Sequence, residues 1–152
     1  MTANKLPLKL LLVLSFALWI LTPLAQADEV VMQNLQVFND AAELAHVTCQ
    51  PNDPFKTVKT EKELQSIYED SIACIEQHIA SIKPAYEQAH AALAANPQAA
   101  AGLDEYYNKW INSMEALVPQ VDEDETTYNL IRYGLYNQTI EIWTNLASEI
   151  GI

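Results

Sequence analysis

Apolar residues recur at steps of three and four along most of the chain, and no segment alternates with the period of two that a half-buried strand requires. This spacing places the apolar side chains on one face of a helix, so we expect an all-α protein. The first stripe predicts a helix over roughly 29–49, which ends at Gln50 and Pro51. Its members are Val31, Leu35, Phe38, Ala42, Ala45 and Cys49.

A second predicted helix begins at Thr60, because Thr60 and Glu63 have the spacing of a capping box. Its stripe continues for about thirty residues through Leu64, Tyr68, Ile72, Ile75, Ile79, Ile82, Tyr86, Ala89 and Leu93. Pro84 lies inside it and removes one helical hydrogen bond, so we expect a kink or a break there. The stripe keeps its phase across Pro84, which favours the kink.

Two further helices complete the prediction. Asn96 is a residue type that favours the N-cap position, and Pro97 is a type that favours the first helical position. Pro119 follows the helix that these two residues begin. The buried face of this third helix holds Leu103, Tyr107, Trp110, Met114 and Leu117. The fourth follows residues 122–125 and carries two stripes, Tyr128, Ile131, Leu135, Ile142 and Leu146 beside Tyr136, Ile140, Trp143 and Ala147. We expect an antiparallel up-and-down bundle. The last helix is expected to be the most deeply buried, the alternative being that one of its aromatic faces is left to bind a ligand.

Residues 1–27 have the pattern of a cleaved signal peptide. Lys5 and Lys9 precede an apolar run over 10–21, Pro23 breaks that run, and Ala25-Gln26-Ala27 forms a small-x-small cleavage site. We therefore expect residues 28–152 to form one mature domain, periplasmic or secreted, with no stable membrane anchor after cleavage.

The mature chain is strongly acidic. Loss of Lys5 and Lys9 with the leader leaves 6 basic against 20 acidic residues, a net charge of −14. Such a charge repels nucleic acid and anionic membranes and favours basic partners or cations. The run Asp122, Glu123, Asp124 and Glu125 is the densest acidic segment, and it is either a docking patch for a basic partner or an electrostatic cap on the last helix.

Cys49 and Cys74 are the only cysteines, and in an oxidising compartment they are expected to form one disulfide. His46 precedes Cys49 by three residues and His78 follows Cys74 by four, so each histidine shares a helix face with its cysteine and four soft-metal ligands would meet where the first two helices pass. Export favours the disulfide over a metal site because the two thiols oxidise first.

No pattern in the sequence specifies a reaction or a cofactor. Covalent haem attachment lacks its motif, no nucleophile elbow occurs, and Arg132 is the single arginine, which disfavours phosphate clamps. We therefore predict a non-enzymatic, exported acidic bundle that binds a basic partner protein, in an inhibitor or immunity-like role. The alternative is a periplasmic carrier of a metal ion or a small apolar ligand.

Overall fold

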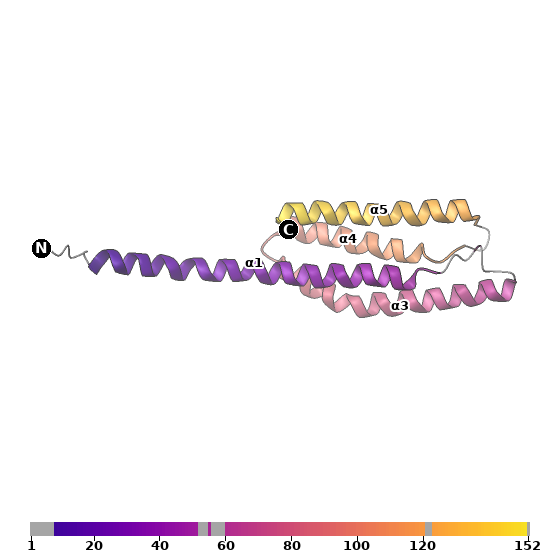
Figure 1. Ribbon diagram of the computed structural model, residues 1–152, viewed down its shortest axis with the longest axis horizontal. Helices are drawn as coiled ribbons and strands as arrows, with labels where there is room; N and C mark the ends of the chain where they lie inside the picture. The colour runs from indigo at the N-terminus through magenta and orange to yellow at the C-terminus, as the bar shows by residue number, and fades with distance from the viewer. Residues whose placement is uncertain (1–7, 52–54, 56–59, 121–122, 152) are drawn as a thin grey trace, which may run out of the picture.

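The computed structural model describes residues 8–51, 55, 60–120 and 123–151, with side chains described from residue 29 onward. Four long helices make up the fold (Figure 1), and their bounds are α1 (Leu8–Cys49), α3 (Glu61–Ala92), α4 (Pro97–Glu115) and α5 (Glu125–Ile150). The all-α prediction is confirmed, and the helices pack as a bundle. Among the described residues, no helix is long and apolar enough to cross a membrane.

The helix ends follow the predicted capping chemistry. Thr60 accepts a hydrogen bond from the Glu63 N–H, and the Glu63 carboxylate accepts one from the Thr60 N–H, which confirms the capping box. Asn96 caps α4 through the Ala99 N–H at 3.1 Å. Gly151 ends α5 in the left-handed conformation, with φ at +80°, which glycine adopts without steric cost.

One helix boundary differs from the expectation. α1 begins at Leu8 and runs through Pro23, so the helix starts well before the predicted residue 29 and extends away from the bundle (Figure 1). α3 continues without a break through Pro84, and its bend there stays a prediction.

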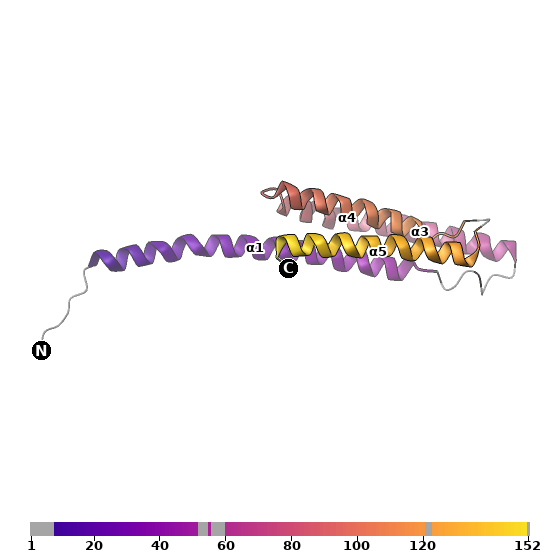
Figure 2. The same ribbon diagram turned by 90° about the horizontal axis from the view of Figure 1, so that it is seen from above.

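The helices form two closely packed pairs, α1 with α3 and α4 with α5. Cys49 and Cys74 join α1 to α3 with their Cα atoms 5.6 Å apart, and toward the other end Phe38 contacts Tyr86 with ring centroids at 5.9 Å. The predicted disulfide is therefore confirmed, and α1 and α3 run antiparallel along this interface. Seen from above, α4 lies to one side of α5 and α1 (Figure 2).

The core consists of the predicted stripes, with one shift on α4. Its largest fully buried apolar side chains are Leu35, Phe38, Leu103, Trp110, Met114 and Leu117. On α4 the fully buried tyrosine is Tyr106 and not the predicted Tyr107, because the Tyr106 hydroxyl reaches a partner on α1. Tyr107 is half-buried and stacks on Tyr86, with ring centroids 4.1 Å apart.

Candidate functional site

A hollow of about 300 Å³ lies between the first half of α3 and the segment that ends α4. We call it the α3–α4 groove, and it is lined by Tyr68, Ile72, Ile75, Glu76, Ile79, Glu115, Val118 and Gln120. Its floor is apolar, while the side chains of Glu76 and Glu115 are exposed. The groove therefore combines a surface that favours apolar side chains with carboxylates that favour cations.

The relative lengths of the helices create this groove. α1 ends at Cys49, which is bonded to Cys74, so the turns of α3 before Cys74 lie beyond the end of α1. Figure 1 shows the start of α3 reaching past the ends of α1 and α5. The apolar stripe continues over these turns, and Tyr68 and Ile72 are consequently only half-buried.

Glu123 of the acidic run is tied to the groove through Gln120. Gln120 lines the groove, and its N–H donates to the Glu123 carboxylate at 3.2 Å while the Glu123 N–H donates to the Gln120 carbonyl at 3.1 Å. These two hydrogen bonds hold Glu123 beside the groove. Glu125, the first residue of α5, is exposed.

Asp124 has a structural role as the N-cap of α5. Its carboxylate accepts hydrogen bonds from the Thr127 N–H and the Thr127 hydroxyl, both at 2.9 Å. These bonds lower the pKa of Asp124 below its ordinary value because they stabilise the charged form. Asp122, the remaining member of the predicted docking run, lies outside the described residues.

The disulfide corner brings together three of the four predicted soft-metal ligands. The Sγ atoms of Cys49 and Cys74 and a ring nitrogen of His78 all lie within 4.8 Å of one another. His46 does not join them, because its ring stacks on Tyr136 of α5, with centroids 4.1 Å apart. The expectation that both histidines meet the cysteines is wrong for His46.

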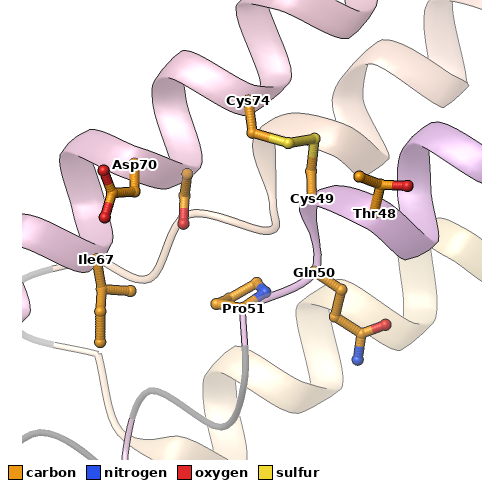
Figure 3. A pocket seen from close by; sticks show the side chains of 8 residues that line it. Thr48, Cys49, Gln50, Pro51, Ile67, Asp70 and Cys74 are labelled. Atoms are coloured by element: carbon orange, nitrogen blue, oxygen red, sulfur yellow. A yellow bond between two sulfur atoms is a disulfide. The ribbon is translucent and has the colours of Figure 1, made fainter.

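A second hollow, of about 360 Å³, borders the disulfide (Figure 3). It lies between the end of α1 and α3, and its lining includes both cysteines together with Thr48, Pro51 and Asp70. The disulfide is therefore next to an open, partly polar space.

His46 and Arg132 form a buried polar corner between α1 and α5. Their exposed fractions are 5% and 7%, and neither His46 Nε2 nor Arg132 Nε has a hydrogen-bond partner among the residues that the structure describes. The Arg132 guanidinium lies over the rings of Tyr128 and Tyr133, 5.2 and 4.5 Å from their centroids, and Nη2 donates to Asn129 at 3.2 Å. Burial and the nearby Arg132 charge lower the pKa of His46 to about 4.

Two sequence predictions on α5 are incorrect, and this corner accounts for the first of them. Ile131 was expected in the buried stripe but is 45% exposed, and Arg132, the next residue, is buried under aromatic rings instead. The helix is also not the most deeply buried element. Leu130, Tyr133 and Ile140 are 74%, 55% and 46% exposed, so α5 presents apolar side chains to solvent.

A crevice between α1, α4 and α5 has a volume of only about 30 Å³, about the share of one water molecule in liquid water. The Tyr106 hydroxyl donates to Asn39 at 2.9 Å, and the Trp110 indole N–H donates to the Ala42 carbonyl at 3.0 Å. Tyr106 and Trp110 are therefore part of the packed core.

Comparison with protein-family models, with curated proteins and with solved structures finds no match for this chain. The function is therefore inferred from the groove, the charges and the buried groups described above.

Proposed function

We propose that this protein binds a basic partner protein, in an inhibitor or immunity-like role without catalysis, and that a basic amphipathic segment of the partner occupies the α3–α4 groove. The observation that carries the proposal is the combination of a half-buried apolar floor with Glu76 and Glu115 at the same hollow. Glu123 adds a third carboxylate at the end of the groove.

The chemistry of the groove favours an amphipathic cation over a purely charged one. Burying apolar area contributes about 25 cal/mol per Å², so apolar side chains on the floor would supply affinity. Lysine or arginine side chains of the partner would remain near the rim, where Glu76 and Glu115 face them. The charge of −14 on residues 28–152 would accelerate encounter with a cationic protein, and salt would weaken that effect.

Export of the protein is part of the proposal. The leader pattern and the intrachain disulfide both fit an oxidising compartment, periplasmic or extracellular. N-terminal sequencing of protein from its native compartment should begin within a residue or two of Asp28. Recovery of a chain that begins at Met1 would contradict this part of the proposal.

The alternative is a carrier of a metal ion or a small apolar ligand, which requires an enclosed cavity or free converging ligands. The crevice among α1, α4 and α5, where the aromatic residues of α5 would bind a ligand, holds about 30 Å³, whereas small-molecule sites start at about 300 Å³. Both cysteine sulfurs are bonded to each other. These observations favour the partner-binding proposal for the oxidised protein.

Titration of a fluorescent peptide tests the proposal. The probe is a helical peptide with lysines on one face and leucines on the other, and its control is a scrambled peptide of equal charge. We expect the amphipathic peptide to bind at least tenfold more tightly than the scrambled one. Binding should weaken as salt rises from 50 to 500 mM.

Matched charge variants separate the groove from the general acidity of the protein. Glu76→Gln with Glu115→Gln removes two charges at the groove, whereas Glu105→Gln with Glu149→Gln removes two exposed charges elsewhere. We expect the first pair to weaken binding about tenfold and the second pair to weaken it less than threefold. Equal effects of the two pairs, or equal affinity for both peptides, would overturn the proposed site.

A further inference from the structure

We propose that reduction of the Cys49–Cys74 disulfide converts the disulfide corner into a zinc site, with Cys49 Sγ, Cys74 Sγ and a ring nitrogen of His78 as ligands. This inference concerns the reduced protein and does not depend on the α3–α4 groove. It rests on the convergence of the three ligand atoms, which lie within 4.8 Å of one another.

In the oxidised protein the two sulfurs are bonded to each other, so they must move apart before they can bind a tetrahedral zinc ion. Zinc binds thiolate sulfur at about 2.3 Å and imidazole nitrogen at about 2.0–2.1 Å, so its ligand atoms lie roughly 3.3–3.8 Å apart. The two cysteine Cα atoms are 5.6 Å apart, so rotation of the side chains after reduction can separate the sulfurs without moving the helices.

The helices hold the ligands in place. Cys74 and His78 are four residues apart on α3 and therefore share one face of it, while Cys49 is the last residue of α1. The hollow of about 360 Å³ borders both cysteines and gives an ion a route from solvent (Figure 3). Three protein ligands leave the fourth zinc position to water, as in open zinc sites.

Reduction of the disulfide requires a reductant, and a dithiol can serve as one. The dithiol gives two electrons and two protons to the Cys49–Cys74 bond and becomes a disulfide itself, which leaves two cysteine thiols. Zn²⁺ then displaces the two thiol protons and binds two thiolates and neutral His78, so the site carries no net charge. The metal would restore the link between α1 and α3 that reduction removes.

Cobalt and zinc binding to the reduced full-length mature protein test this inference. Anaerobic titration with Co²⁺ should give a thiolate-to-cobalt charge-transfer band that saturates at one ion per chain, and Zn²⁺ should displace the cobalt. The oxidised protein should give no such band. Absence of the band in the reduced protein would overturn the proposal.

Two histidine variants make the test specific. His78→Ala should weaken Co²⁺ binding at least tenfold, whereas His90→Ala, which removes a half-exposed imidazole beside Asp104, should leave it within twofold. Zn²⁺ should also raise the melting temperature of the reduced wild type, or refold it if reduction unfolds it, and should fail to do so for reduced His78→Ala. Equal behaviour of the two variants would overturn the assignment of His78.

Discussion

His46 of α1 stacks on Tyr136 of α5, with ring centroids 4.1 Å apart and ring planes inclined by 17°. α1 and α5 make few other contacts with each other, and the stacked rings lie next to the buried side chain of Arg132. A positive charge and an imidazole thus share an interior corner, and this arrangement keeps the imidazole neutral.

Stability should fall as the pH drops from 6.5 toward 4, in part because of His46. The ordinary pKa of 6.5 applies to the unfolded chain and about 4 to the folded one, so the unfolded state binds more protons in this range. Urea unfolding at pH 7.0 and 4.5 measures the loss. His46→Phe keeps a ring against Tyr136, and it should lose about 2 kcal/mol less than the wild type over this interval. Identical losses in the two proteins would contradict the low pKa.

Replacing Arg132 with methionine should leave the free energy of unfolding unchanged or higher. Arg132 is 7% exposed and has no carboxylate partner among the described residues, so no ion pair offsets the cost of taking its charge out of water. Urea unfolding at pH 7 measures stability. The same variant should raise the pKa of His46, measured by NMR titration, because the neighbouring charge is gone. A loss above about 2 kcal/mol would show that the aromatic contacts of Arg132 stabilise the fold.

Tyr106→Phe should cost about 1–2 kcal/mol of unfolding free energy. The change leaves the buried Asn39 Oδ1 without its hydrogen bond from the Tyr106 hydroxyl. Tyr107→Phe is the matched control, since this neighbouring tyrosine is half-buried and its hydroxyl has no hydrogen-bond partner among the described residues. The control should change stability by less than about 0.5 kcal/mol. Equal costs would mean that the Tyr106–Asn39 bond has no net effect.

The double variant Cys49→Ala with Cys74→Ala should lose about 3.5 kcal/mol. The disulfide closes a segment with a sequence separation of 25, and its chief effect in the chain-entropy model is on the unfolded state. Equilibrium urea unfolding in a metal chelator isolates this contribution. Equal urea midpoints for the variant and the wild type would contradict the prediction.

Local sequence signals predicted the starts of α3 and α4 and most of the core. Thr60 with Glu63, and Asn96 with Pro97, specify helix starts through their own hydrogen-bonding chemistry, which is independent of the rest of the fold. The apolar periodicity gave a wrong prediction on α5, where Arg132 is buried and Ile131 is exposed. The Arg132 guanidinium packs against the rings of Tyr128 and Tyr133, which buries this charged residue. A pattern of apolar positions cannot predict the burial of a charged side chain.

The α3–α4 groove could not be predicted from periodicity alone. Tyr68 and Ile72 belong to the same stripe as the buried Ile82, and nothing local distinguishes them. The difference arises because α1 ends at Cys49 and α4 ends at Glu115, which leaves the first turns of α3 partly uncovered. The position of His46 was missed for a similar reason, since its partner Tyr136 comes from a helix whose placement the sequence does not specify.

Mapping of amide chemical shifts in the ¹⁵N-labelled mature protein tests the binding site most directly. On addition of the basic amphipathic peptide, the largest shifts should cluster at Tyr68, Ile72, Glu76 and Glu115 around the α3–α4 groove. Ile72→Gln should abolish most of these shifts while the protein remains folded, because it removes part of the apolar floor. Shifts spread evenly over the acidic surface, or centred on Tyr133 and Ile140 of α5, would contradict the account.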